Sequence, residues 1–596
     1  MRAGLWIVSA SIAAFGGLLA ADPLPAQQSA PVIELNQAWS QDDREWYWNF
    51  SQGSAVIDYD IFLNLEVAGG QDLFRSDANV VRYGLIPQPT NRYNPDGLPI
   101  GISKATLATP IKGRRAGDYV GIWPAGDYMG FTCAACHTSQ LRYKGKLILI
   151  DGAGSNAIDL QGVVRGFDDA LRTTLTDAAK FDRLASRLKA SSPAAKDELR
   201  KRVQSESDRM HYYVTQEMIS RYPFGPGRLD ALALIFTRMM AQLPGIPANS
   251  NISKAPVKPP FLWNAPQGLW TQWRGAQQDP IQRNVQESAA VWLAVDLSSK
   301  SPAEGLFQSS SPILDVGRVE DQLERLAPPS WPEDVFGKID RDKAKVGKAR
   351  FVEYCASCHN VWPYRWTEPN KYGKSYILVG LTPQTYVGTD GTYFETNPFS
   401  LTGELSNFLP PEFKDKPILP TLAFFAAISR PLLDTAMEKL NLTEAQKLDL
   451  HGYRVPGGGF ATTRPPDQVF KAAPRDGVWA TAPFLHNGSV PNLYEMLIPA
   501  AERTKKFYLG GDFDPVRVGL DTKATSGTFL MDTTLPGNSN AGHSFESGPR
   551  GNGVIGPLLP EDDRLAIVEY LKSIPEEAGR VTPFGGPPQT SSPQKP

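Results

Sequence analysis

Apolar side chains recur at helical spacing in the stretch KAKVGKARFVEYCASCH, in the second half of the chain. Val346, Ala349 and Val352 stand three positions apart, with Phe351 beside them. This is the period of an amphipathic helix, because residues three and four apart lie on one face. The pattern predicts a helix that runs directly into Cys355.

A second helical pattern lies near the C-terminus, in PEDDRLAIVEYLKSI. Leu565, Val568 and Leu571 form its apolar stripe. Pro560 and the acidic residues after it suit the first turn of a helix, where the helix dipole favours negative charge. We therefore predict a second helix close to the end of the chain.

These two helices resemble the frame of class I cytochromes c, in which an N-terminal helix leads into the haem motif and a C-terminal helix packs across it. Gly347, Phe351 and the following two cysteines are spaced four, four and three apart, as in that frame. The resemblance implies that Tyr570 and Leu571 pack against the Gly347–Phe351 side.

The first half of the chain has a different pattern. DYVGIWPAGDYMGFTCAACH is rich in glycine, proline and aromatic residues, so no regular helix is predicted before Cys133. LRYKGKLILIDGAGS predicts a hairpin that turns at Lys144 and Gly145. DLQGVVRGFDDALRTTL predicts a helix, and residues 177–222 are predicted to be mostly helical.

Length and composition narrow the class of protein. A chain of 596 residues is too long for one ordinary core, so we expect two large domains. The formal net charge is −2, which gives no basic field for nucleic acid or anionic lipid. The 52 glycines and 51 prolines predict long, turn-rich connections.

The N-terminus has the build of a secretory signal peptide. Arg2 is followed by an apolar run over residues 4–21 and then by small residues and prolines. A membrane anchor is the alternative, but glycine, serine and alanine dilute the run. We predict a cleaved signal over residues 1–26, no stable membrane insertion, and a periplasmic or secreted protein.

All four cysteines belong to two copies of one motif, C-x-x-C-H. The first motif is Cys133, Cys136 and His137, and the second motif is Cys355, Cys358 and His359. This is the attachment signature of c-type haem: the thiols bind the porphyrin, and the histidine is an axial ligand of the iron. The alternatives are thioredoxin-like redox pairs and a zinc site that joins both pairs. We predict two covalently bound haem c groups, with His137 and His359 as metal ligands.

The resemblance to class I cytochromes c implies that a second axial ligand for the iron of the second motif comes from the loop before the last helix. His543, in the polar stretch PGNSNAGHSF, lies in that loop, and imidazole is a common haem ligand. Met531 and His486 are the alternatives. Methionine would raise the reduction potential relative to a second histidine.

The iron of the first motif has no such partner in the sequence. His211 is the other histidine of this half, and its helical surroundings favour a structural role. Without it the distal position at His137 is open, and an open iron can bind dioxygen or peroxide. His137 is therefore the predicted catalytic residue.

Several further stretches carry a family resemblance: PFGPGRLDAL, PPFLWNAPQGLWTQWRGAQQDPIQRNVQES, YVGTDGT, WATAPFLHNGSVPNLYEML and GNSNAGH. Together with the motifs they resemble the rubber-oxygenase-like branch of bacterial di-haem c-type proteins, which are relatives of the di-haem cytochrome c peroxidases. The resemblance implies an active, open first haem and a second haem that has two histidine ligands and transfers electrons.

The resemblance leaves the reaction open between a dioxygen-dependent oxygenase and a hydrogen peroxide reductase. A peroxidase needs a distal acid or base, for which Glu287 and Glu217 are candidates, although exposed helix positions are the simpler interpretation of both. An oxygenase for an apolar organic substrate needs an apolar wall. The aromatic segment could supply it, or could belong to the core; its members are Phe261, Trp263, Trp270 and Trp273.

The fold expected from these patterns is mainly α, with long loops and few short strands, in two heavily extended cytochrome c-like haem domains. The predicted domains are 27–331 and 332–574, with a disordered tail over 575–596. The function expected is an exported di-haem oxidoreductase supplied with electrons by a small redox protein. A pure electron-transfer cytochrome is the alternative. Asn94 and Asp96 are candidate calcium ligands, but their loop lacks the full ligand series.

Overall fold

A computed structural model describes residues 31–113, 122–395, 401, 403–409, 411–414, 416, 425–454 and 468–578. The predicted signal peptide lies outside the described residues. Among them, no helix is both long and apolar enough to cross a membrane.

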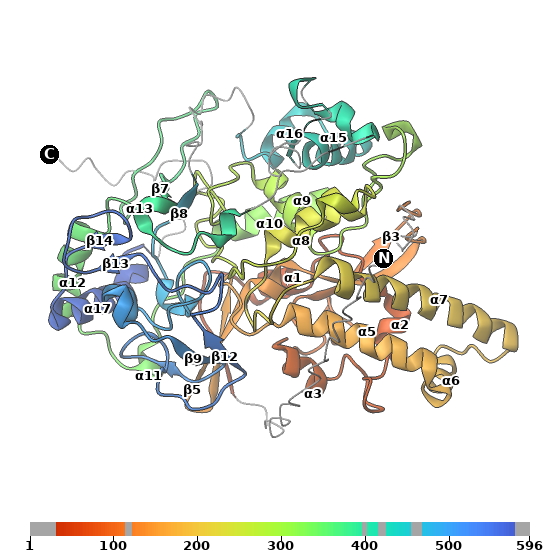
Figure 1. Ribbon diagram of the computed structural model, residues 1–596, viewed down its shortest axis with the longest axis horizontal. Helices are drawn as coiled ribbons and strands as arrows, with labels where there is room; N and C mark the ends of the chain where they lie inside the picture. The colour runs from red at the N-terminus through yellow and green to blue at the C-terminus, as the bar shows by residue number, and fades with distance from the viewer. Residues whose placement is uncertain are drawn as a thin grey trace, which may run out of the picture.

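The architecture is mixed rather than mainly α, with helix over 39% of the chain and strand over 16% (Figure 1). The strands form small separate sheets, because long loops divide them. The helices are α1 Gln41–Asn49, α2 Tyr59–Asn64, α3 Asp77–Val80, α4 Cys133–Cys136, α5 Leu160–Thr176, α6 Ala178–Arg187, α7 Pro193–Tyr212, α8 Ala231–Phe236, α9 Pro280–Ala290, α10 Ile313–Arg325, α11 Glu333–Phe336, α12 Arg341–Tyr354, α13 Gln384–Val387, α15 Arg430–Lys439, α16 Glu444–Leu450 and α17 Glu561–Ala578.

The strands are short, and most pair in twos and threes. They are β1 Val32–Glu34, β2 Ile57–Asp58, β3 Ile102–Leu107, β4 Gly126–Phe131, β5 Thr138–Tyr143, β6 Lys146–Asp151, β7 Gly380–Pro383, β8 Val469–Ala472, β9 Lys506–Leu509, β10 Phe513–Asp514, β11 Gly519–Leu520, β12 Phe529–Asp532, β13 Ser544–Phe545 and β14 Val554–Gly556.

Two three-stranded sheets bracket the first motif. Strand β4 runs directly into α4 and pairs antiparallel with β2 and β3. After the motif, β5 and β6 form the predicted hairpin, in which Lys144 and Gly145 both have positive φ, at 47° and 75°. That pair of left-handed residues is what a tight two-residue hairpin turn requires. The first motif therefore follows a strand, and the expectation that no helix precedes Cys133 is confirmed.

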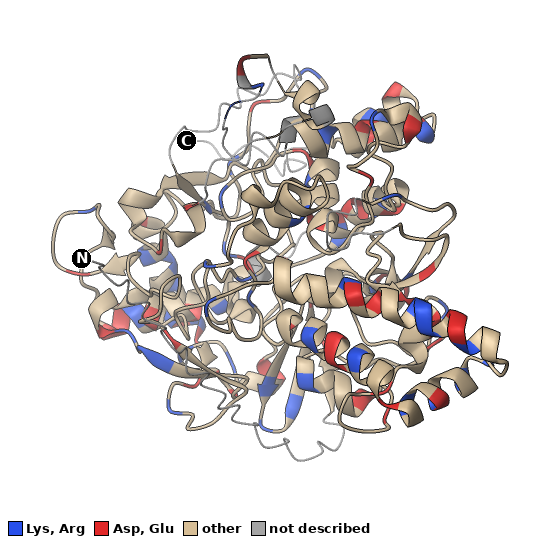
Figure 2. Ribbon diagram, turned by 45° about the vertical axis from the view of Figure 1, so that its right-hand side comes forward, with Lys and Arg blue, Asp and Glu red and all other residues tan. Residues whose placement is uncertain are grey.

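Helices α5, α6 and α7 project together from one side of the molecule (Figure 1). The predicted helix after the hairpin is α5, and the mostly helical stretch after it contains α6 and α7. Figure 2 shows both signs of charge along these projecting helices, as in the pair between Lys196 and Asp182 at 2.6 Å. Opposite charges on one solvated surface leave no basic patch there.

The predicted crossing of helices is present in the second half. Helices α12 and α17 lie against each other on the left of Figure 1. A Cβ added at Gly347 would stand 1.8 Å from the Ala566 carbonyl oxygen, so the close approach of the two helices requires glycine. The rings of Phe351 and Tyr570 are 5.4 Å apart. The Gly347–Phe351 side does receive the last helix.

The buried face of α12 differs from the predicted stripe. Val346 and Val352 are each 51% exposed, whereas Ala344, Gly347 and Phe351 are buried. The apolar residues mark the wrong face because the contact is made through glycine and alanine, which let α17 come close. The last helix also continues to Ala578, four residues into the predicted tail; the rest of that tail lies outside the described residues.

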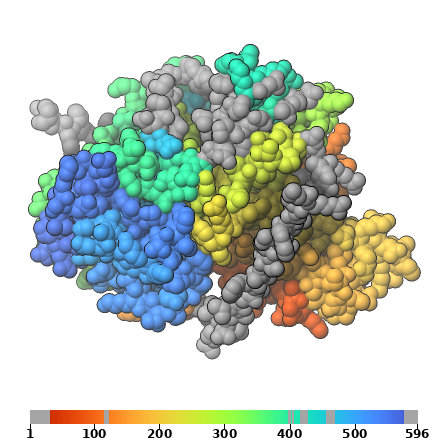
Figure 3. Space-filling model, in the orientation of Figure 1, coloured from red at the N-terminus to blue at the C-terminus, as the bar shows by residue number. Residues whose placement is uncertain are grey.

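The largest hydrophobic cluster draws on both predicted halves. It joins Trp39 and Trp263 from the first half to Phe351, Trp479 and Val568 from the second. In the space-filling view the C-terminal residues form a continuous face at the left, against the middle of the chain (Figure 3). A shared core fixes the two motifs relative to each other.

Candidate functional site

The two motifs adopt the same local conformation. The backbone N–H of His137 donates to the carbonyl of Cys133 at 2.9 Å, and that of His359 donates to Cys355 at 2.8 Å. Each motif thus forms one helical turn that ends at its histidine. All four cysteines are free thiols. Free thiols in pairs, each followed by a histidine, are what covalent haem attachment needs.

The motif histidines are oriented in the same way. His137 Nδ1 lies 2.9 Å from the carbonyl oxygen of Pro260, and His359 Nδ1 lies 2.9 Å from that of Ala473. A hydrogen bond from Nδ1 to a backbone carbonyl fixes the tautomer that leaves Nε2 unprotonated for a metal. Burial also lowers the pKa of His137 to about 4, which keeps its imidazole neutral.

The Nε–H of Arg475 also approaches His359 Nδ1, at 2.9 Å. The two contacts require opposite tautomers, because Nδ1 cannot donate to Ala473 and accept from Arg475 at once. We assign the proton to Nδ1, since the same carbonyl contact recurs at His137. The Arg475 guanidinium is then left facing the cavity.

One hydrogen bond ties together the segments that orient the two histidines. The indole N–H of Trp263, three residues after Pro260, donates to the carbonyl of Asp476 at 2.7 Å. Asp476 in turn follows Ala473 by three residues. Trp263 also stacks on Phe261 with ring centres 4.8 Å apart. The positions of the two motif histidines are therefore coupled through the buried core.

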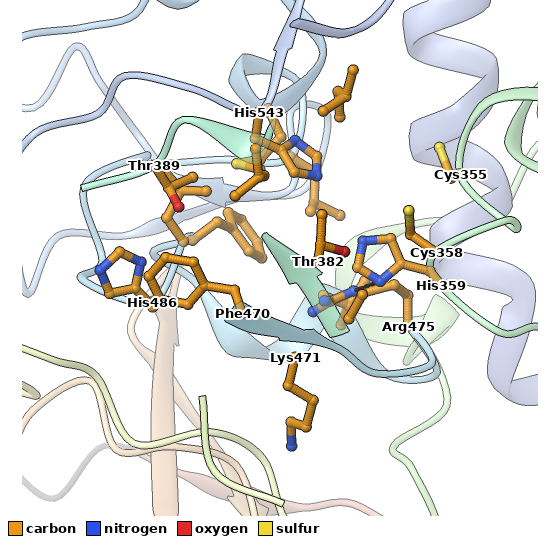
Figure 4. Close-up of a pocket in the computed structure, with 18 of the residues that line it drawn as sticks. Cys355, Cys358, His359, Thr382, Thr389, Phe470, Lys471, Arg475, His486 and His543 are labelled. Carbon is orange, nitrogen blue, oxygen red and sulfur yellow. Dashed lines mark hydrogen bonds between the residues drawn. The ribbon is translucent and has the colours of Figure 1, made fainter. Parts of the chain in front are cut away.

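His359 and His543 face each other across a cavity of about 210 Å³ that the second motif lines (Figure 4). Their ring centres are 6.3 Å apart and their planes make an angle of 49°. A metal–imidazole bond is about 2 Å long, and the ring centre lies roughly 1 Å behind the nitrogen, so two imidazoles on one metal stand about 6 Å apart. The cavity is walled mainly by apolar side chains, including Phe351, Phe470 and Ile567. These residues fit a haem c with two histidine ligands.

A buried arginine holds the loop that carries His543. The Arg503 guanidinium donates to the carbonyls of Asn540, Gly542 and His543 at 2.6 to 2.8 Å. His543 has a φ of 45°, a rare backbone conformation for a residue with a side chain. Its own N–H donates to Val387 at 2.7 Å. The backbone of this loop is therefore fixed on both sides in the conformation that points the imidazole at His359.

The two alternative ligands occupy other places. Met531 is fully buried on β12, in a small cluster with Phe507 and Leu520 that lies apart from the cavity. His486 lines the cavity but stacks on Phe470, with ring centres 4.4 Å apart. Burial lowers the pKa of His486 to about 4, so it is a neutral ring of the cavity wall.

The first motif has charged neighbours on α9. Arg283 forms a buried ion pair with Glu320. Burial raises the pKa of the thiols of Cys133 and Cys136, and the nearby charge of Glu287, one turn after Arg283, raises it further. Burial raises the pKa of Glu287 itself. Glu287 is therefore not the exposed helix residue that its sequence suggested.

The other glutamate proposed from the sequence has a structural role. Glu217 is fully buried, pairs with Arg238 at 3.0 Å and accepts from the Trp292 indole at 2.9 Å. The expectation of an exposed helix position was wrong here too, because a π-helical turn directs this side chain inward. With both oxygens bound, Glu217 is not free for proton transfer.

His211 is far more exposed than the motif histidines. Its side chain is 48% exposed on α7, and its Nδ1 lies 3.2 Å from Asp168 and 2.9 Å from Arg172. These contacts belong to a surface cluster on the projecting helices. All six histidines of the chain are among the described residues, and no other histidine ring there contacts that of His137.

The competing interpretations of the cysteines lack support. Burial raises the pKa of the thiols of Cys136 and Cys355 to about 12, so these thiols are protonated in the absence of a metal. Redox-active pairs depend on a lowered pKa. Within the described parts of the chain, no three side chains of His, Cys, Asp or Glu gather as a metal ion would require.

The candidate calcium loop has other contacts. Asn94 closes its own turn, with its side chain bound to the N–H and the carbonyl of Leu98 at 2.8 Å. Asp96 accepts a hydrogen bond from the Tyr59 hydroxyl at 2.7 Å. Both side chains are engaged in holding the loop.

The aromatic segment divides between two surroundings. Trp263 is 1% exposed and belongs to the core, whereas Phe261 and Trp273 line the cavity of the second motif. Trp273 donates to the carbonyl of Lys258 at 2.6 Å. The segment therefore borders the second motif, and through Pro260 it also reaches His137.

Sequence reasoning missed several residues of the site. Pro260 and Ala473 act through their backbone carbonyls, and every residue type has such a carbonyl, so the sequence gives no sign of these contacts. Arg503 is a buried cation, and Lys471 and Arg475 are half-buried cations; all three lie in segments that showed no periodic pattern. Lys471 and Arg475 could have been noticed only by their position, because they lie just before the WATAPFLHNGSVP stretch that carries the family resemblance.

Part of the sequence around the second motif's cavity is similar to a known family. Residues 469–508, which contain β8, Arg475, His486 and Arg503, match the sequence model of a family described as "RoxA-like, cytochrome c-like". This segment is similar to that of RoxA-like cytochromes, and a cytochrome c-like domain implies haem c.

The relatives extend the match over nearly the whole chain. "Uncharacterized protein y4iJ" of Sinorhizobium fredii is 30% identical over 580 residues, which cover 91% of this chain and 93% of that protein. The chain belongs to the same family. "Uncharacterized protein y4iM" of the same organism is 27% identical over 334 residues, covering 53% of this chain and 63% of the relative.

Proposed function

We propose that the protein is an exported di-haem c-type oxidoreductase. The haem on the first motif activates dioxygen or peroxide, and the haem on the second motif relays electrons from a small redox protein. The RoxA-like cytochrome c-like segment supports a haem-based oxidoreductase or electron-transfer role. Covalent attachment of haem c and the N-terminal sequence support a periplasmic or secreted location.

The asymmetry between the two motifs carries this proposal. His359 has His543 opposite it at 6.3 Å between ring centres, the spacing of two ligands on one metal. His137 has the same local geometry but no histidine facing it among the described residues. A haem iron with two protein ligands transfers electrons, whereas one with an open position can also bind a small molecule.

The chain's own groups prepare each site in a defined way. At both sites the backbone carbonyl that accepts from Nδ1 fixes the imidazole and increases its basicity as a ligand. The apolar wall of the second site, with Phe351 and Phe470, excludes water from the porphyrin. Haem iron, when bound, supplies the redox chemistry, and the protein determines which site is accessible.

Carbon monoxide binding tests the open position. We expect the reduced wild-type protein, with two haems, to bind one carbon monoxide per chain, because it needs a vacant axial position. The measurement is a Soret titration together with a pyridine haemochrome assay for haem content. Binding of two molecules per chain, or of none, would contradict the proposal; none would favour a pure electron-transfer cytochrome.

Peroxide reduction is the second candidate reaction, and Glu287 favours it. Glu287 lies near the thiols of the first motif and has a raised pKa because it is buried. Its carboxylate accepts a long hydrogen bond from the Gln272 amide at 3.4 Å. A carboxyl with a raised pKa near the first motif would be suited to deliver a proton in the cleavage of a peroxide bond.

The substitution Glu287→Gln separates the two reactions. If peroxide is the substrate, kcat/KM for peroxide should fall by about 10²- to 10⁴-fold, the usual contribution of a general acid or base. Haem content and carbon monoxide binding should not change. Glu198→Gln, the same chemical change on a side chain that is 69% exposed, is the control. Equal peroxide turnover in both variants would exclude Glu287 from this role and favour the oxygenase.

A further inference from the structure

Strand β8 borders the cavity of the second motif, which Phe470, Lys471 and Ala472 line. Phe470 and Lys471 point to opposite sides of the strand, as successive residues do. Phe470 stacks on His486 in the cavity, while Lys471 points away from His359 and His543 (Figure 4). The charges of Arg283 and Glu287, which flank the first motif, act on Lys471. Lys471 thus stands between the two motifs.

Lys471 and Arg475 are cations that the fold does not neutralise. Both line the cavity, and burial lowers the pKa of Lys471 to about 7 and of Arg475 to about 10. Among the described residues, the Lys471 ammonium makes no hydrogen bond or ion pair. Arg475 makes no ion pair with a carboxylate there, and its guanidinium approaches Nδ1 of His359.

The fully buried cations among the described residues have partners. Arg238 pairs with Glu217 and Arg283 pairs with Glu320. Lys258, which also lines the cavity, donates to the carbonyls of Thr481 and Pro483. Burying a charge is costly unless it is paired or hydrogen-bonded, so two unpaired cations four residues apart call for an anion.

We propose that Lys471 and Arg475 form a carboxylate-binding site in the wall between the two motifs, and that a haem propionate fills it. This inference rests on the proposed binding of haem. Each haem brings two carboxylates into a largely apolar cavity, and a charge-assisted hydrogen bond from a buried ammonium is a strong way to hold one. A nearby cation also favours the reduced haem, so the site raises its reduction potential.

The test is a spectroelectrochemical titration of the holoprotein. In Lys471→Met we expect the reduction potential of one haem to fall. The expected change is a shift of about tenfold in its equilibrium toward the oxidised form, which corresponds to about 59 mV for a one-electron couple. Lys471→Arg should keep the wild-type potential. Lys345→Met removes a charge from a side chain that is 78% exposed on α12, and should leave both potentials unchanged.

The outcomes separate this inference from the proposed function. Two haems in the wild type with unchanged potentials in Lys471→Met overturn the inference and leave the proposed function standing; a wild type without covalent haem overturns both. If Lys471→Met loses haem, Lys471→Gln and Lys471→Arg are compared with it. Loss of haem in the two neutral variants, Met and Gln, but not in Lys471→Arg supports a requirement for positive charge. Loss of haem in Lys471→Arg as well overturns the inference.

Benzoate, a soluble carboxylate, is used to test whether the site binds a haem propionate or a carboxylate from solution. A saturable Soret shift of the wild type on adding benzoate, abolished in Lys471→Met, would support the carboxylate site but assign it to a soluble carboxylate. No response to benzoate together with the shifted potential supports the propionate.

Discussion

Replacing His543 by alanine should convert the haem of the second motif completely from low-spin to high-spin, while the first haem is unchanged. The reason is geometric: the His543 ring is the one that faces His359, at 6.3 Å between ring centres. Removing it leaves no imidazole on that side of the iron. The measurement is the Soret and electron paramagnetic resonance spectrum of the oxidised protein, and added imidazole should restore the low-spin form.

Two matched variants control for this result. His486→Ala removes a histidine from the same cavity wall, and Met531→Leu removes the methionine that the sequence left as an alternative. Both should keep the second haem low-spin, because neither side chain faces His359. If His543→Ala remains low-spin and one of these variants turns high-spin, that residue is the ligand instead.

Replacing Arg503 by methionine should destabilise the protein by about 3 kcal/mol and also loosen the second haem's distal ligand. Three loop carbonyls, including that of His543, would lose their donor, and an unsatisfied buried acceptor costs about 1–3 kcal/mol. Denaturant unfolding gives the stability, and the fraction of high-spin haem reports on His543.

Arg238→Met distinguishes destabilisation from positioning. It breaks the fully buried pair with Glu217, which should cost about 3–5 kcal/mol. This pair lies away from the His543 loop, so the spin state should not change. If Arg503→Met loses stability but keeps a fully low-spin haem, the arginine supports the fold without directing the ligand.

The sequence was informative wherever a pattern follows from local geometry. The hairpin at Lys144 and Gly145, helix α5 and the helix that leads into Cys355 were all predicted from short-range spacing. The crossing of α12 and α17 was also predicted, from resemblance to a known frame. The buried face of α12 was not, because glycine and alanine make the contact and the valines of the apparent stripe face solvent.

Residue type alone gave a wrong prediction for two glutamates, which were expected to be exposed. Glu217 and Glu287 stand in helical stretches of mixed character, where a charged residue is usually exposed. Their burial depends on partners far along the chain: Trp292 is 75 residues from Glu217, and Gln272 lies on a separate loop from Glu287. No local pattern carries that information.

The sequence by itself determined the chemistry that the chain can support: two C-x-x-C-H motifs, a scarcity of other histidines, and a polar loop that placed His543 before the last helix. Only the tertiary structure decided which groups meet. It brought His543 opposite His359, gave each motif histidine a distant carbonyl as its acceptor, and left Lys471 and Arg475 without a carboxylate in the described residues. The physical reason is that covalent attachment needs cysteines at fixed local spacing, whereas axial ligation and charge balance depend on folding segments more than 100 residues apart into one core.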